Sequence, residues 1–130
     1  MIVVDVSAVV DYLLDRGERG QWVRAELERA DVLHAPHLVD YETTSATRKK
    51  VLGRQISAER GVKALGDLGA LRVRRYPAQP FIERVWALRQ TVSARDAFYV
   101  ALAEALACPL VTTDGRLARS HGHDALIRSP

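Results

Sequence analysis

Four acidic residues of this chain occupy positions from which their carboxylates could act together. Asp5 ends an apolar run, Glu42 lies in the first turns of a helical stretch, Asp96 opens another such stretch, and Asp114 follows a short apolar run. Each acid therefore lies near the carboxyl end of an expected strand or the amino end of an expected helix. In an open parallel sheet these ends meet at one edge, where ligands bind. We therefore expect the four carboxylates to converge.

Converging carboxylates repel each other, by roughly 4 kcal/mol per pair at a separation of ~4 Å and an effective dielectric constant of ~20. A divalent cation removes this conflict. Oxygen ligands with no cysteine or histidine among them favour Mg²⁺ or Mn²⁺ over zinc. The joint placement of the acids thus predicts a site for a hard divalent cation.

Each acid taken singly also has a structural explanation. Asp5 and Asp114 are of a type favoured at helix N-caps and in turns. Glu42 suits the dipole at the start of a helix, and Ser93 with Asp96 has the spacing of a capping box. Capping does not require the four acids to share an edge, so it is their joint position that favours the metal site.

Short β-type runs alternate with helical stretches along the chain, which predicts an α/β domain with a parallel sheet. Residues 94–107 are apolar on nearly all sides, which is typical of a central helix. The expected strands are 1–4, 32–35, 71–76, 110–112 and 125–127, and the expected helices are 7–15, 19–30, 36–53, 57–69, 80–92, 94–107 and 117–120.

The chain has 130 residues, a length that suits one domain with one core. It contains no apolar run of membrane-spanning length and no signal-peptide pattern, and Cys108 as the single cysteine cannot form an internal disulfide. We therefore expect a cytoplasmic protein. The net charge of +3, carried mostly by arginine, is compatible with an anionic partner.

Three blocks of the sequence resemble the PIN-domain ribonucleases of the VapC toxin type. They are DVSAVVDYLL from Asp5, SARDAFYVALAEAL around Asp96, and CPLVTTDGRLAR around Asp114, and the helix with Glu42 adds to them. The resemblance covers nearly the whole chain. It implies a single PIN-like nuclease domain over residues 1–130, with a three-layer α/β/α fold and a central, mainly parallel sheet of about four to five strands.

The resemblance also implies the site and its activity. The acidic metal-binding and catalytic set falls on Asp5, Glu42, Asp96 and Asp114, with Ser7 and Thr112 as supporting hydroxyls. The activity implied is a Mg²⁺-dependent endoribonuclease, in which Mn²⁺ can substitute and a metal-activated water attacks the phosphodiester bond. Some relatives have a further acid just after the fourth, where this chain has Gly115-Arg116-Leu117, so the number of metal ions stays open.

Basic residues near these acids are the candidates for contacts with the RNA backbone. Arg95, Arg116 and the cluster Arg48-Lys49-Lys50 are the candidates, although a run of charges is often only a solvated face. The relatives cut single-stranded or looped RNA, in which unstacked bases are accessible.

The resemblance further implies a small cognate antitoxin and a homodimer. Leu13, Leu14, Trp22 and Val23 of the first two helices are candidates for an apolar groove that binds the antitoxin. Val62, Leu65, Val85 and Trp86 are candidates for a dimer surface.

Two other functions fit parts of the pattern. A phosphatase with an aspartyl nucleophile also has an acid after its first strand, but needs a second acid two residues later, where this chain has Ser7. A PIN-like module that binds RNA or protein without cleaving it would keep the fold and lose the metal, whereas all four acids are present here.

Overall fold

A computed structural model describes all 130 residues, and its centre is a sheet of five parallel strands. The strands are β1 (Ile2–Val4), β2 (Leu33–Pro36), β3 (Val73–Tyr76), β4 (Leu110–Val111) and β5 (Ile127–Arg128), in the order β3-β2-β1-β4-β5. The expected α/β class and the parallel sheet are thereby confirmed.

Strand β1 lies in the middle of the sheet, between two strands distant from it in sequence. Ile2 pairs with Leu33 of β2, and Val3 pairs with Leu110 of β4. The strand order therefore reverses direction beside β1, and this kind of switch point opens a crevice at the carboxyl ends of the strands. Asp5 follows β1 directly at that crevice.

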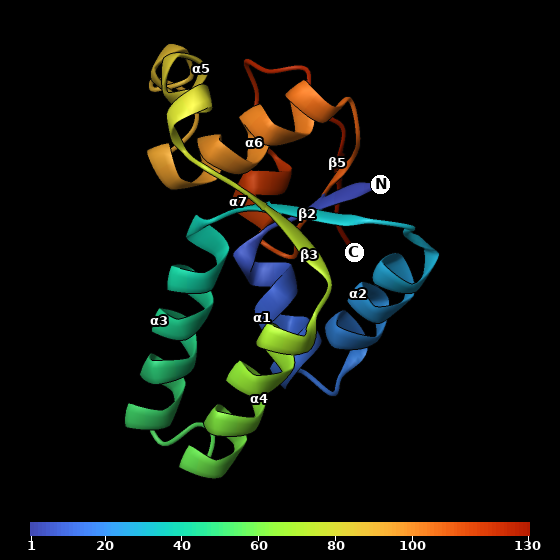
Figure 1. Cartoon of the computed structure of the whole chain (residues 1–130), viewed down its shortest axis with the longest axis vertical. Helices are drawn as coiled ribbons and strands as arrows, with labels where there is room; N and C mark the ends of the chain where they lie inside the picture. Colours follow the sequence, from blue (N-terminus) through green and yellow to red (C-terminus); the bar gives the residue numbers. More distant parts are fainter.

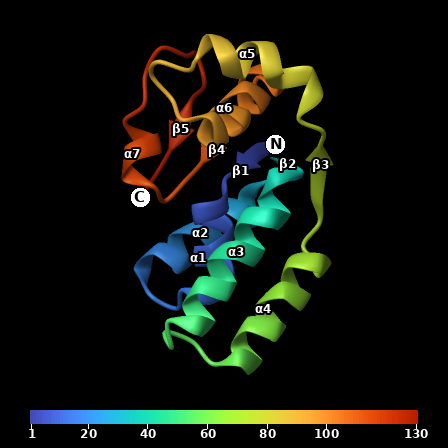
Figure 2. The same ribbon diagram turned by 90° about the vertical axis from the view of Figure 1, so that its left-hand side faces the viewer.

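Helices cover both faces of the sheet, so the molecule has three layers. Figure 2 shows α5 and α6 above the sheet and α1 to α4 below it, and Figure 1 shows α5 and α6 at one end of the molecule and α3 and α4 at the other. The helices are α1 (Val6–Leu14), α2 (Glu18–Arg29), α3 (Leu38–Leu52), α4 (Ala58–Ala70), α5 (Ile82–Ala87), α6 (Ala94–Leu106) and α7 (Gly115–Ala118), with the 3-10 turn η1 (Gln79–Phe81) before α5.

The core forms where α6 packs on the central strands. Val3, Val4 and Leu110 of the sheet and Val100 of α6 are completely buried. Alanines of α6, such as Ala97, let the helix approach the sheet closely, and Ala97 is itself fully buried. The central position expected of residues 94–107 is confirmed, and it fixes the first turn of α6 over the edge where β1 ends.

Several expected boundaries are wrong. The last helix and the last strand, expected over 117–120 and 125–127, are α7 at Gly115–Ala118 and β5 at Ile127–Arg128. Pro36 does not open a helix but ends β2, where it pairs with Tyr76, and α3 begins at Leu38. A proline is tolerated there because the strand ends at that residue. The helix expected over 80–92 is divided into η1 and the short α5, and turns follow from Leu88. No helix is both long and apolar enough to cross a lipid bilayer.

Candidate active site

The four acids named above line one pocket at the carboxyl edge of the sheet. The pocket has a volume of about 580 Å³, and Asp5, Glu42, Asp96 and Asp114 all face it. They come from four segments that are far apart in sequence: the end of β1, α3, the first turn of α6, and the turn after β4. The convergence expected from the sequence is therefore present in the structure.

Asp5 is the buried end of this pocket and is held by hydrogen bonds. Its Oδ1 accepts bonds from the Ser7 hydroxyl at 2.7 Å and from the Ala8 backbone N–H at 3.0 Å. Its Oδ2 accepts a bond from the Thr112 hydroxyl at 2.9 Å. The supporting roles expected of Ser7 and Thr112 thus correspond to direct contacts with the carboxylate.

The same hydroxyls hold the turn that carries Asp114. The Thr113 backbone N–H donates to Ser7 Oγ at 2.9 Å, and the Asp114 backbone N–H donates to Thr112 Oγ1 at 3.0 Å. Two small side chains therefore connect the end of β1 to the end of β4. As a consequence, the same two hydroxyls orient the Asp5 carboxylate and the backbone that carries Asp114.

Burial works against ionisation of Asp5. Removal from water raises the pKa of its carboxyl to about 6, against the bonds from Ala8, Ser7 and Thr112 that lower it, and the negative charge of Asp96 adds a small further rise. With a pKa of about 6 the Asp5 carboxyl is still largely ionised at neutral pH, and a bound cation would offset the cost of keeping that charge buried.

Glu42 is positioned from a third direction, by a residue of the central helix. The Tyr99 hydroxyl, which is buried, donates a 2.9 Å hydrogen bond to Glu42 Oε1, and Arg95 lies 3.5 Å from Glu42 Oε2. Burial raises the pKa of the Glu42 carboxyl, while Tyr99 and Arg95 oppose the rise. The side chain is thus held at the wall of the pocket and does not extend into solvent.

Asp96 and Asp114 each lie at the start of a helix as well as in the pocket. Ser93 is the N-cap of α6, and its hydroxyl accepts a bond from the Asp96 backbone N–H at 3.3 Å. Asp114 is itself the N-cap of α7 and accepts from the Arg116 backbone N–H at 2.8 Å. Burial, followed by the neighbouring Asp114 charge, raises the pKa of the Asp96 carboxyl. Capping and convergence are therefore both features of this site.

The donor chemistry of the pocket fits a hard divalent cation. Its acidic ligands are all carboxylates, with neither histidine nor cysteine in the lining. No three acidic, histidine or cysteine side chains of the molecule are drawn together into a closed ligand cluster. The carboxylates border a shared space, and the shell around an ion would be completed by water or substrate, as is usual for Mg²⁺.

Several basic residues border the same pocket. Arg95 and Arg116 both line it, and of the basic cluster on α3 only Lys49 does so, whereas Arg48 and Lys50 do not. Lys49 lies seven residues after Glu42, two helical turns along the same face. Tyr41, whose side chain is 76% exposed, stands at the rim beside Glu42.

Sequence reasoning missed two contacts that hold the site together. Tyr99 lies three residues after Asp96 on α6, and this spacing could have indicated a common face. Asp11 accepts a 2.6 Å bond from the Thr113 hydroxyl, which joins α1 to the turn before Asp114. No local pattern indicates that second contact, because 102 residues separate its partners.

The apolar groove expected on the first two helices is only partly correct. Leu13 and Leu14 line a groove of about 560 Å³ between α1, α2 and α4. Val23 is completely buried and Trp22 packs against the core, so neither lines the groove. The reason is that this face of α2 packs inward. The charged residues of the lining are mostly basic: Arg16, Arg24, Arg60, Arg72 and Lys63, the last of which is paired with the one acid of the lining, Asp67.

The four residues expected on a dimer surface do not form one patch. Val62 is 74% and Trp86 67% exposed, whereas Val85 is buried and Leu65 packs against the core. Val62 lies on α4 and Trp86 on α5, and these helices are at opposite ends of the molecule in both views (Figures 1 and 2). Only the α5 surface, where Ile82 is also exposed, has two large apolar side chains one helical turn apart.

Comparison with known proteins agrees with this geometry. Residues 2–121 match the PIN domain family. The chain is 44% identical over 127 residues to Ribonuclease VapC12 of Mycobacterium tuberculosis, an alignment that covers 98% of this chain and 97% of that protein. It is 47% identical over 118 residues to VapC ribonuclease Mb0985 of Mycobacterium bovis, covering 91% and 89%. The chain therefore belongs to the PIN-domain family, within which these relatives are VapC ribonucleases.

Solved structures of low sequence identity share the fold. The crystal structure of Mycobacterium tuberculosis VapC20, described as a sarcin-ricin loop cleaving toxin, superimposes with a TM-score of 0.71 at 18% identity, covering 97% of this chain and 98% of that one. VapBC2 of Rickettsia felis, solved with a promoter DNA fragment, gives a TM-score of 0.67 at 15% identity over 99% and 98% of the chains. The expected three-layer PIN-like fold is confirmed.

Proposed function

We propose that this chain is a divalent-metal-dependent endoribonuclease and the toxin of a toxin–antitoxin pair. The observation that carries the proposal is the meeting of four carboxylates, from four separate segments, in one pocket at the carboxyl edge of the sheet. Family membership supports it, since the relatives with 44% and 47% identity are named as ribonucleases.

Asp5, Asp96 and either Asp114 or Glu42 would hold the ion, Mg²⁺ or Mn²⁺, and all four acids are the proposed catalytic set. The cation supplies an activated water and neutralises charge that develops on the phosphate. Ser7 and Thr112 orient Asp5, and Tyr99 orients Glu42, through the hydrogen bonds described above. Arg95, Arg116 and Lys49 line the same pocket, and they are the residues proposed to contact the RNA backbone.

A cognate antitoxin would bind the groove between α1, α2 and α4. Leu13 and Leu14 provide an apolar floor, and the surrounding arginines provide a positive rim, whereas Lys63 is paired with Asp67. This combination favours a segment with apolar anchors flanked by acidic residues. Solved relatives of this fold include a toxin–antitoxin complex from Klebsiella pneumoniae.

The homodimer is proposed to form on α5. Ile82 and Trp86 are 55% and 67% exposed and lie four residues apart, on one face of the helix. Large exposed apolar side chains next to each other are typical of interaction surfaces.

The test of the central proposal is cleavage of mixed RNA with EDTA, Mg²⁺ or Mn²⁺. We expect cleavage only with metal, and near-complete loss in Asp96→Asn. Asp31→Asn, which removes an exposed acid far from the pocket, is the matched control and should cleave like the wild type. Phosphate release from small phosphomonoesters without RNA cleavage would instead favour the phosphatase, and RNA binding without cleavage would favour the non-catalytic module.

A further inference from the structure

A second pocket continues from the catalytic pocket along α7. It has a volume of about 340 Å³ and shares Ser93, Asp96 and Arg116 with the first. Beyond these shared residues its lining includes the basic side chains of Arg119 and His121. The two pockets therefore form one continuous depression, which begins at the carboxylates and is lined by basic side chains at its far end.

Arg119 is directed back toward the catalytic turn. A Cβ atom placed on Gly115 would lie 3.0 Å from Arg119 Nη1, so the guanidinium group rests against the residue that follows Asp114. The absence of a side chain at Gly115 makes room for it. The guanidinium group thus lies against the first residue of α7, which follows Asp114 in sequence and is the i, i+4 neighbour of Arg119.

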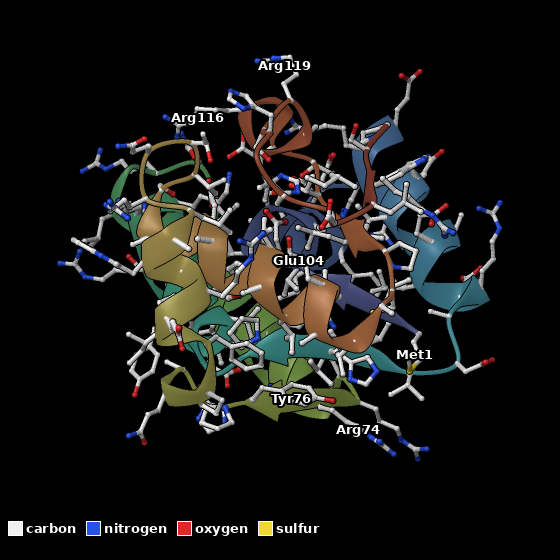
Figure 3. The ribbon with its side chains drawn as sticks, turned by 90° about the horizontal axis from the view of Figure 1, so that it is seen from above. Met1, Arg74, Tyr76, Glu104, Arg116 and Arg119 are labelled. Atoms are coloured by element: carbon white, nitrogen blue, oxygen red, sulfur yellow. The ribbon has the colours of Figure 1, made fainter.

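The guanidinium group of Arg119 forms no ion pair with an acid of the molecule. The ion pairs of the molecule involve other basic residues, and the Arg119 side chain is exposed to solvent. Arg116 and Arg119 extend from the same edge of the molecule, whereas Arg74 lies at the opposite edge (Figure 3). Hydroxyl groups of Thr91, Ser93 and Ser120 complete the lining of the second pocket. Thr91 and Ser120 already donate to backbone carbonyls, whereas Ser93 accepts from the Asp96 N–H and keeps its own proton for a ligand.

We propose that this second pocket, with Arg119 as its main ligand, binds the phosphate of the nucleotide next to the scissile bond. An RNA strand carries one phosphate at each nucleotide, so a strand whose scissile phosphate lies at the carboxylates presents another one beyond them. A guanidinium group binds phosphate oxygens through two parallel hydrogen bonds, which favours arginine over a point charge. The inference rests on the proposed ribonuclease function and adds the path of the substrate.

The experiment uses a short single-stranded RNA whose cleavage site by the wild-type protein has been mapped. One flanking phosphate at a time is replaced by an uncharged methylphosphonate, on the 5′ and then on the 3′ side. We expect a loss in kcat/KM of about 10-fold to 100-fold on one side only, because charge-assisted hydrogen bonds are lost there. Arg119→Ala should show a similar loss on the unmodified RNA and no additional loss with that methylphosphonate.

Two variants separate this role from others. Arg119→Lys keeps the charge without the planar fork, and should fall between the wild type and Arg119→Ala. Arg74→Ala removes an exposed arginine at the opposite edge, and should cleave every substrate as the wild type does. Thermal melts of all variants, expected to match the wild type, exclude a loss through unfolding.

Unchanged kcat/KM in Arg119→Ala would overturn the inference. It would also be overturned if the methylphosphonate and the substitution lowered the rate independently, since the arginine would then not contact that phosphate. Both results leave the ribonuclease function in place. Failure of the wild type to cleave RNA with any divalent metal would instead overturn the ribonuclease function and this inference together.

Discussion

The Thr112 hydroxyl donates a 2.9 Å hydrogen bond to Asp5, although 107 residues separate the two in sequence. Both residues follow neighbouring parallel strands, β1 and β4, and both are nearly inaccessible to solvent. The same hydroxyl oxygen accepts a bond from the Asp114 backbone N–H. One side chain therefore orients one acid of the pocket and the backbone of another.

Replacing Thr112 by valine should damage both stability and activity. The variant keeps the shape but leaves the buried Asp5 oxygen and the Asp114 N–H without their partner, which should cost about 1 to 3 kcal/mol in the free energy of unfolding. A small shift of Asp114 should lower RNA cleavage on the order of 10-fold to 100-fold. Urea unfolding and cleavage assays measure the two effects. Thr112→Ser, which keeps the hydroxyl, is the control, and equal behaviour of the two variants would refute the proposed role of the bond.

Asp5 should make the metal-free protein less stable as the pH rises from about 4 to 6. Its pKa in the folded state is about 6, above the ordinary value of 3.8, so the folded state binds more protons than the unfolded state across this range. The protonated Asp5 carboxyl contributes its full stabilisation to the folded state below pH 3.8, and this stabilisation is lost as the pH rises through about 6. The loss in the free energy of unfolding is about 3 kcal/mol.

Unfolding by urea at several pH values in EDTA measures this effect, with Asp5→Asn for comparison. Other acids titrate in both proteins, so the difference between the two curves isolates Asp5. We expect the wild type to lose stability relative to Asp5→Asn between pH 4 and 6. If the stability of the two proteins changed in parallel with pH over that range, the pKa of Asp5 would not be raised in the folded state.

Asp96→Asn should separate metal binding from helix capping. Ser93, not Asp96, is the N-cap of α6, so the variant keeps the cap while losing a charge that faces Asp5 and Asp114. The metal-free variant should therefore melt at the wild-type temperature or above it. A capping role alone would instead cost the variant ~0.3 to 1 kcal/mol.

Metal should stabilise the wild type more than this variant. A ligand that binds only the folded state adds about 2.7 kcal/mol at a concentration of 100 times its Kd. Thermal melts of both proteins in EDTA and in Mn²⁺ give the comparison. A destabilised variant with undiminished RNA cleavage would falsify the catalytic role of Asp96.

Leu14→Ala should weaken binding of the cognate antitoxin by roughly 10-fold, because part of a buried apolar contact is lost in the groove. Leu14 is only partly buried and is not packed against the core, so the fold should be unaffected. Calorimetric titration measures the affinity. Val62→Ala, on a residue of α4 outside the groove, should bind as the wild type does, and equal weakening by both substitutions would place the antitoxin elsewhere.

Trp86→Ala should convert the proposed homodimer into a monomer. Light scattering of the wild type at micromolar concentration should give twice the chain mass of 14.4 kDa, and the variant should give the single mass. A wild type that scatters only as a 14.4 kDa species would end the dimer proposal. A dimer that survives the substitution would exclude the α5 surface.

Local pattern was sufficient for much of this molecule. The alternation of apolar runs and helical stretches predicts the class of fold, because periods of about two and 3.6 residues reflect which side of each element is buried. An acid at the end of a strand or in the first turn of a helix is likewise visible in one sequence window. The positions of Asp5, Asp96 and Asp114 at such ends are therefore predictable without any structure, and so is the kind of oxygen ligand that they would offer to a cation.

Tertiary structure alone decided which of these elements are neighbours. Strand order β3-β2-β1-β4-β5 places Thr112 beside Asp5, and the packing of α6 on that sheet directs Tyr99 toward Glu42. The same applies to surfaces, since consecutive residues of a helix point in different directions and only packing decides that Val23 is buried. Such contacts join residues of distant segments, and they depend on how whole helices and strands bury their apolar faces together, a property that no local window contains.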